Sequence, residues 1–468
     1  MDRAVFFWPL IAAVAAVIAA SSLRTAAYIT IGSIFFPLYV GALGRDVVTS
    51  TTLFILIVYG KHFIRSYNRP RSALDVFVFL LLLSGTVSAV LSVVSVYPDV
   101  FRMGYSVRHY LGFASAILLF LLLEDSGRAA HEPAAASRGP RVNTVLSLVL
   151  ILTAVHVVIS IGVKYVPSLG SAFALFVPKG EVFDIPGRGS IERMGSFALG
   201  GAENYGELLA VLAPIVVYKM FSGRLWWGLC LMLFALGEIF SVTRSGILLM
   251  AAGTFIAILV HGRSNAMRFA GLAYVLTGAL LGLVFLLPGV VGDMTERFGL
   301  ALQTYDSTGD FFEAINRAEL PRRWEDLCSE LSLFGRGFVP TPFGHGPVHF
   351  HNLVLTTLYR LGAVGCFLFL LVAAWPAGRL MRRLAAGRRM HAPLAFSCLL
   401  SMALLGVNEM KFEFTREAPY QQLIWALLGV FASIGQTEAA SLPTGEDSEG
   451  ARPDAADRAG AAAGAAPG

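Results

Sequence analysis

The chain has 468 residues, of which 56% are hydrophobic and 14% are charged, with a net charge of +5 and a mean hydropathy of +0.67. A soluble protein carries roughly 25% charged residues, so this composition excludes an ordinary soluble enzyme. The apolar residues fall in blocks long enough to cross about 30 Å of hydrocarbon as helices, which predicts an all-α, polytopic membrane protein. The positive charge is typical of basic cytoplasmic loops and does not indicate nucleic-acid binding.

Thirteen apolar segments are predicted to span the bilayer, or twelve if one of the short, crowded first three is interfacial or broken. The first is interpreted as a retained helix rather than a secretory signal, because only Arg3, offset by Asp2, precedes it and many spans follow. The predicted spans are 4–21, 27–43, 47–63, 74–96, 103–123, 143–165, 203–221, 224–241, 245–261, 267–289, 352–376, 392–410 and 418–436.

The distribution of Lys and Arg over the short loops predicts which side of the membrane each loop faces. Basic stretches alternate onto one side, which we assign to the cytoplasm: 61–71, 138–141, 219–224, 263–268 and 378–389. The long polar segments 166–202 and 290–351 then lie on the outer side of the membrane, the second of them between the tenth and eleventh spans. The predicted membrane domain covers residues 1–436, and the Ala/Gly/Pro-rich residues 437–468 are predicted to form a disordered cytoplasmic tail.

The second outer segment is predicted to carry helical structure of its own. Apolar and charged residues alternate at helical spacing over 311–334, and Pro321 interrupts the pattern. We expect two short helices over the outer face of the bundle. A packing element without chemistry is the alternative interpretation.

One histidine-bearing stretch at the outer boundary has clear chemical meaning. The run HGPVHFHNLVLTTLYRLG at 345–362 passes from polar residues into an apolar segment. An imidazole there can take or give a proton near neutral pH, so His351, with Asn352 beside it, is a candidate general base. His345, His349 and His351 have HxxxHxH spacing, but the stretch is rich in Pro and Gly and has no adjacent carboxylate, so zinc is the weaker interpretation. A structural boundary histidine is the other alternative.

Arginines are also predicted on the outer side. Arg193 precedes the segment GSFALGGAENYGELLAVLAP, and Arg244 lies between two closely spaced helices, where the positive-inside tendency would not place it. The large outer loop holds four more: Arg317, Arg322, Arg323 and Arg336. Guanidinium groups that converge there would suit a diphosphate, because their planar fork matches phosphate oxygens. Anchoring to lipid headgroups is the alternative for each of them.

Ionisable residues inside the predicted spans bear on a second class of function. A secondary transporter or flippase for a lipid-linked or anionic solute would carry charges near mid-span and broken helices in symmetric positions. The centres of the predicted spans are mostly uncharged. The exceptions are interpreted as polar groups that face the bundle interior: Glu207, Glu238, Asn408 and Glu409.

Four stretches follow one another in a fixed order over residues 190–365. They are RMGSFALGGAENYGELLA at 193–210, SVTRSGILLM at 241–250, the Arg-Arg-Trp and LFGRG stretches of the outer loop, and HNLVLTTLYRLG at 351–362. In this order they resemble the bacterial O-antigen ligase and O-antigen polymerase superfamily. The first stretch departs from the family pattern by a glycine one residue early, and in the second Ser245 stands between Arg and Gly.

The resemblance implies an inverting glycosyltransferase that needs no metal or cofactor and works at the periplasmic face of the bacterial inner membrane. Its donor would be a glycan on undecaprenyl diphosphate. Its acceptor would be lipid A–core in a ligase, or another glycan in a polymerase. The apolar spans would supply a groove for the polyprenyl chain.

The same resemblance implies roles for individual residues. His351 would deprotonate the acceptor hydroxyl for attack on the anomeric carbon. Arg193 and Arg244 would bind the diphosphate and stabilise charge on the leaving group. The further substrate-binding residues that it implies are Arg317 or Arg322, Asn204 and Asn352.

Overall fold

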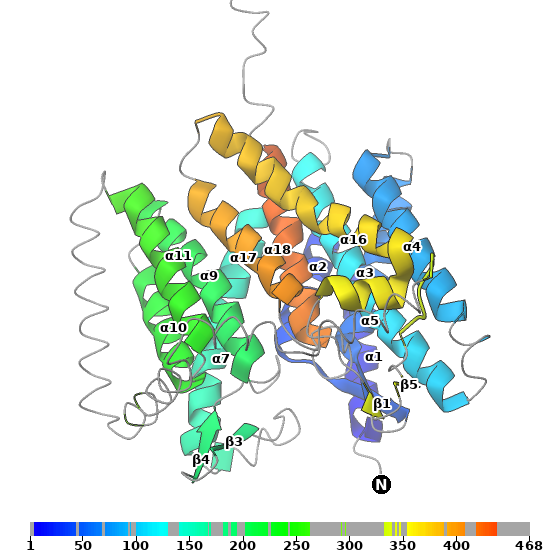
Figure 1. The fold of residues 1–468 in the computed structure, drawn as a ribbon, viewed down its shortest axis with the longest axis horizontal. Coiled ribbons are helices and arrows are strands. Elements are labelled where there is room, and N and C mark those ends of the chain that lie inside the picture. Colours follow the sequence, from blue (N-terminus) through cyan, green and yellow to red (C-terminus); the bar gives the residue numbers. More distant parts are fainter. Residues whose placement is uncertain are drawn as a thin grey trace, which may run out of the picture.

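The structure is a computed structural model whose described parts form a helical bundle with short pieces of the connecting loops (Figure 1). The described residues are 4–43, 46–67, 71–91, 94, 100–129, 140–166, 168–169, 181–185, 189–193, 202–222, 226–241, 244–262, 292, 295, 332–338, 342–343, 346–347, 353–387, 391–407 and 418–437.

Helices make up most of the described chain. They are α1 (Ala4–Ala20), α2 (Leu23–Phe35), α3 (Ser50–Ser66), α4 (Ala73–Leu91), α5 (Val100–Ala129), α7 (Val142–Tyr165), α9 (Ala202–Ser222), α10 (Trp227–Ser241), α11 (Arg244–Gly262), α16 (Leu353–Ala385), α17 (Ala392–Val407) and α18 (Ala418–Thr437). Within the described residues, four stretches are long and apolar enough to cross a bilayer: Ala73–Leu91, Ser106–Ser126, Val142–Tyr165 and Thr357–Ala385. The chain is therefore a helical membrane protein, as its composition predicts.

Three antiparallel hairpins interrupt the helical pattern, and the sequence analysis predicts none of them. They pair β1 (Tyr39–Leu43) with β2 (Asp46–Thr49), β3 (Glu181–Ile185) with β4 (Gly189–Arg193), and β5 (Pro342–Phe343) with β6 (Gly346–Pro347). All three lie toward one end of the bundle, at the bottom of Figure 1. We call this the hairpin end. The periplasmic side predicted above corresponds to this end.

The first hairpin corrects the predicted span 27–43, because α2 ends at Phe35. Pro37 follows shortly after, and it lacks the N–H group that a continuing helix needs. The carbonyl oxygen of Phe35 accepts a hydrogen bond of 2.6 Å from Nε2 of His156 in α7, so the buried helix end is satisfied by a side chain. The β-branched residues of 46–49 then favour a strand over a helix.

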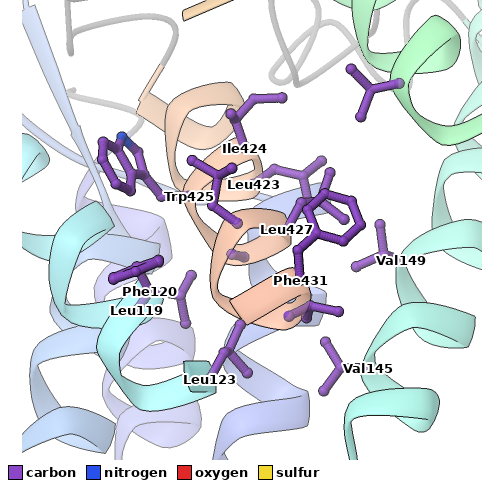
Figure 2. Close-up of a cluster of buried hydrophobic side chains, with 14 of the residues drawn as sticks. Leu119, Phe120, Leu123, Val145, Val149, Leu423, Ile424, Trp425, Leu427 and Phe431 are labelled. Carbon is purple, nitrogen blue, oxygen red and sulfur yellow. The ribbon is translucent and has the colours of Figure 1, made fainter. Parts of the chain in front are cut away.

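The core centres on α18, which lies between α5 and α7 in Figure 2. Trp425 of α18 packs edge-to-face on Phe120 of α5 and on Phe369 of α16, with ring centroids 5.7 and 5.4 Å apart. Gly429 lies so close to α5 that an added Cβ would be 2.6 Å from the carbonyl oxygen of Phe120. Large aromatic contacts and a close backbone approach therefore hold α18 in the middle of the bundle.

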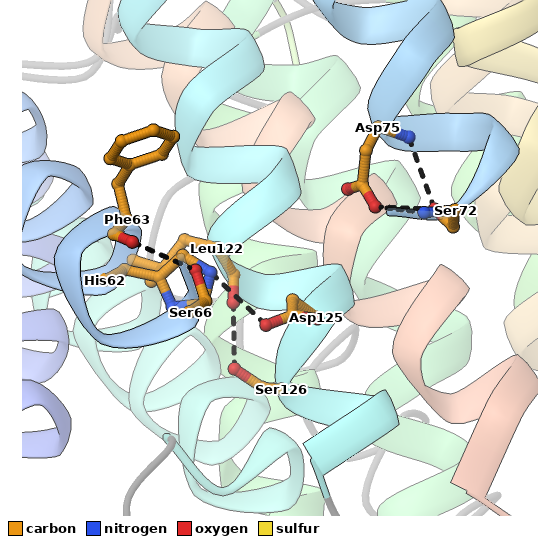
Figure 3. Close-up of polar contacts among 8 residues, drawn as sticks. All are labelled: His62, Phe63, Ser66, Ser72, Asp75, Leu122, Asp125 and Ser126. Atoms are coloured by element: carbon orange, nitrogen blue, oxygen red, sulfur yellow. Dashed lines mark hydrogen bonds and ion pairs between the residues drawn. The ribbon is translucent and has the colours of Figure 1, made fainter. Parts of the chain in front are cut away.

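Charged side chains join the helices at the end opposite the hairpins. Nε2 of His62 in α3 lies 3.2 Å from Asp125 of α5 (Figure 3), and Arg379 of α16 lies 3.1 Å from Glu124 of α5. The ammonium group of Lys61 donates hydrogen bonds of 2.5 to 2.8 Å to three carbonyl groups at the end of α1. These contacts bring the C-terminal ends of α1, α3 and α5 together.

The predicted span 352–376 also needs correction. α16 runs from Leu353 to Ala385, but Gly362 inside it has φ +71° and ψ −175°, which is not helical. The helix is therefore broken near its start, and Figure 1 shows its first part, in yellow, turned away from the direction of the rest. The predicted span 267–289, most of the predicted helical segment 311–334 and the predicted tail beyond residue 437 lie outside the described residues.

Candidate functional site

Buried polar side chains occur along the whole described bundle, and eleven of them lie in helix turns toward the hairpin end. We call the following residues the polar layer: Ser84 and Ser88 of α4, Arg108 and His109 of α5, Asn204 and Glu207 of α9, Glu238 of α10, Thr357 and Arg360 of α16, and Tyr420 and Gln421 of α18. Placing so many polar groups inside a membrane bundle is costly, and such residues mark functional sites by default. The hairpin end is therefore the candidate site.

Acidic side chains occupy one part of the polar layer. Glu207 is 1% exposed and Glu238 is 0% exposed, which confirms the prediction that they face the bundle interior. The hydroxyl of Tyr420 donates to Oε2 of Glu207 over 3.4 Å, joining α18 to α9. Asn408 and Glu409, predicted to behave in the same way, lie outside the described residues.

Basic side chains occupy another part of the layer, and the sequence analysis does not single them out. Arg108 is 5% exposed and Arg360 is 8% exposed, and His109 is fully buried. Arg108 and His109 lie within the predicted span 103–123. An ionisable pair inside an apolar segment is the signal that points to them.

The two arginines that are predicted to bind the diphosphate each lie at one end of a strand or a helix, and both lie toward the hairpin end. Arg193 is the last residue of β4, opposite Glu181 of β3 in the register of the hairpin. Arg244 is the first residue of α11 and follows closely on Ser241, the last residue of α10. Arg244 therefore begins a helix close to the end of the preceding one. The backbone N–H groups of a helix start add partial positive charge at this position.

The other predicted site residues divide into two groups. Asn204 lies in the first turn of α9 and is buried, at 5% exposed, within the polar layer. The remaining predicted site residues lie outside the described residues: His351, Asn352, Arg317 and Arg322. Their meeting with Arg193 and Arg244 stays a prediction.

The LFGRG stretch at 333–337 is held against the break in α16. We call residues 332–338 the docked segment. Its Arg336 and Gly337 N–H groups donate to the carbonyl groups of Tyr359 and Arg360 over 2.8 and 3.0 Å. In the other direction, the N–H groups of Ala363 and Val364 donate over 3.3 Å to the carbonyl groups of residues 332 and 333. Two motifs of the resemblance are thus joined by main-chain bonds.

No group of three or more His, Cys, Asp or Glu side chains within the described part of the chain is placed to hold a metal ion. What the described arrangement offers chemically is a set of buried cations, carboxylates and hydroxyl groups. Such a set suits hydrogen bonding to an anionic, hydroxyl-rich ligand.

No model of a known protein family matches the chain, and no curated protein matches it. The function must therefore be argued from the motifs and from the contacts of the chain's own residues.

Proposed function

We propose that this protein is an inverting, metal-independent glycosyltransferase of the O-antigen ligase and polymerase type, in the bacterial inner membrane. One observation supports the proposal most. The described parts of all four motif stretches lie toward the same end of the bundle: Arg193 ends β4, Arg244 begins α11, the docked segment lies on α16, and α16 begins two residues after His351. Motifs far apart in sequence share one surface when they serve one site.

The proposed reaction uses these residues in three roles. His351 takes the proton from an acceptor hydroxyl, and the oxygen attacks the anomeric carbon of a glycan on undecaprenyl diphosphate. The bond from that carbon to the diphosphate oxygen breaks on the opposite face, which inverts the configuration. Arg193 and Arg244 bind the departing diphosphate and stabilise its charge, and Arg317 or Arg322 assists. Diphosphate is already a good leaving group, so neither nucleotide nor metal takes part.

The donor would remain partly in the bilayer while it reacts. Apolar side chains project outward from the bundle, among them Phe79 at 65% and Leu248 at 65% exposed, and these match a hydrocarbon environment. A polyprenyl chain is compatible with such a surface, while its diphosphate lies at the level of the polar layer. Asn204 and Asn352 would contact the sugar or the diphosphate.

Two acceptors fit the proposal equally, because both present a hydroxyl group to the same base. Lipid A–core would make the protein a ligase, and a growing glycan would make it a polymerase. The difference lies in the product. A ligase adds one glycan to a lipid, whereas a polymerase extends the repeat.

A transporter or flippase for a lipid-linked or anionic solute is the second candidate, and a specific observation favours it. α16 is broken at Gly362, two residues after the buried Arg360, and broken helices with buried charged residues are found in many transporters. The break, however, lies close to the start of α16 and toward the hairpin end, whereas a transporter site is expected at mid-membrane. We therefore favour the enzyme.

The test uses the purified full-length protein in detergent with an undecaprenyl-diphosphate glycan. Lipid A–core and free glycan are offered in separate reactions containing a metal chelator and no nucleotide. We expect transfer to one of them, with inverted configuration at the new linkage, and the length of the product separates ligase from polymerase. Absence of transfer to both acceptors, together with movement of the intact donor across proteoliposomes, would overturn the proposal in favour of a flippase.

A further inference from the structure

The break in α16 leaves main-chain groups without helical partners. At Gly362 the last carbonyl groups of the first half (residues 353–361) and the first N–H groups of the continuing helix cannot bond to each other. Within a membrane protein such groups must be satisfied by other parts of the protein, because an unsatisfied group in hydrocarbon costs several kcal/mol. The docked segment supplies these partners through four main-chain hydrogen bonds.

Two glycines make this approach possible. Gly335 in the docked segment has φ +74° and Gly362 in α16 has φ +71°, a region that favours glycine. The two backbones also press against each other. A Cβ added to Gly335 would overlap the carbonyl group of Arg360 and the nitrogen of Gly362, and a Cβ added to Gly362 would overlap the nitrogen of Gly335 and the carbonyl group of Leu333. Each glycine therefore occupies the space that a side chain on the other would need.

Side chains fix the docked segment on both flanks. Phe338 is 1% exposed, and its ring packs against Tyr110 and Phe113 of α5, with centroids 5.9 and 5.6 Å apart. On the other flank, the hydroxyl of Ser88 in α4 donates to the carbonyl oxygen of Arg360, which also accepts from Gly337. The docked segment is thus built into the bundle between α4, α5 and α16.

We infer that Gly335 and Gly362 are positioning residues: their contact fixes the docked segment in the break of α16 and so sets the direction of the first half of α16, which directly follows His351. The first half is held through the carbonyl groups of Tyr359 and Arg360. A change in its direction would move the residues before Leu353 relative to the bundle. The catalytic part of this inference rests on the proposed function, whereas the docking itself does not.

Hydrogen exchange on the full-length protein tests the docking. The amides of Arg336, Gly337, Ala363 and Val364 donate to main-chain carbonyls, so peptides covering 332–338 and 359–364 should exchange slowly in the wild type. G335A and G362A should each accelerate exchange in both peptides together. Fast exchange of 332–338 in the wild type would overturn the inference.

Two other glycines provide matched controls, one within α16 and one shortly after its end. Gly378 lies in the helix with open space around a new Cβ, so G378A tests the loss of a glycine alone. Gly387 has φ +81° with open space, so G387A tests backbone strain alone. Both should leave exchange in 332–338 unchanged. If G335A and G362A do not fold, S88A serves in their place, because it removes one hydrogen bond to Arg360 and adds no atom.

Glycan transfer by the same variants tests the positioning role. G335A and G362A should lower kcat by on the order of 10²-fold, because a misplaced catalytic group costs about this much, with the KM for the donor nearly unchanged. Faster exchange with wild-type kcat would overturn the positioning role. If the wild type transfers no glycan, the proposed function fails and the catalytic part of the inference fails with it, while hydrogen exchange still decides the docking.

Discussion

Glu124 of α5 is fully buried, and Arg379 of α16 reaches its carboxylate at 3.1 Å. The guanidinium group also lies over the ring of Trp375, 5.2 Å from its centroid. The pair lies at the end of the bundle opposite the hairpins. A carboxylate buried in this way depends on its cation, because charge is expensive to desolvate.

Removal of one partner of the pair should therefore lower the free energy of unfolding more than removal of both partners. We expect R379A to lower the free energy of unfolding by about 3 kcal/mol, since it removes the guanidinium group that lies against the buried carboxylate. The double variant E124Q/R379A should recover a large part of this loss. Thermal unfolding in detergent measures both, and equal destabilisation by the single and the double variant would contradict the account.

Individual residues also show which features of the site can be predicted from the sequence and which cannot. Burial of Glu207 and Glu238 follows from their place in apolar segments, and both are buried as predicted. Arg108 and His109 carry the same signal, but they lie in the first third of the predicted span 103–123, where a charged residue can equally belong to the membrane boundary. The contact between Gly335 and Gly362 joins residues that are distant in sequence, and no local sequence pattern predicts it.

Helices are the elements that the sequence predicts best. α7 (Val142–Tyr165) and α9 (Ala202–Ser222) differ from their predicted spans by a residue or so at each end, because a long apolar run has few alternatives in a membrane. The hairpins and the break in α16 are missed for a common reason. Hydropathy is averaged over a window of many residues, so it shows where apolar segments lie. A single glycine or a few strand residues hardly change this average, and the break of a helix or a short hairpin is therefore not detected.

The close approach of α18 to α5 gives a prediction for whole elements. A Cβ at Gly429 would lie 2.6 Å from the carbonyl oxygen of Phe120, so G429A should push the two helices apart and destabilise the fold by about 1–3 kcal/mol. G32A in α2 is the matched control, since nothing lies within 4 Å of its new Cβ. At this position the higher helix propensity of Ala should raise the free energy of unfolding by up to about 1 kcal/mol. The same sign for both variants in thermal unfolding would contradict this packing.

For the molecule as a whole, the two ends of the bundle differ in character. The hairpin end carries the polar layer and the docked segment, whereas the opposite end carries ion pairs and the lysine that caps α1. The basic stretch 61–71 begins within the last turns of α3 and is predicted to be cytoplasmic, which would place the hairpin end in the periplasm. The orientation of the whole bundle therefore decides the compartment in which the site works.

Labelling of introduced cysteines tests this orientation. In a background whose four cysteines are replaced, L169C near the hairpin end should react in intact spheroplasts with a thiol reagent that cannot cross the membrane. Ile64, near the end of α3, is 77% exposed, and I64C should react only after permeabilisation. The reverse pattern would place the hairpin end in the cytoplasm and exclude a periplasmic transferase.

The role proposed for His351 is base catalysis of glycan transfer. Its most direct test compares H351A with H345A, a histidine of the same loop with no assigned role, in the transfer of glycan from undecaprenyl diphosphate. H351A should lower kcat by about 10²–10⁴-fold, the usual contribution of a general base, while H345A should stay near the wild type. Wild-type transfer by H351A, or an equal loss in both variants, would contradict it.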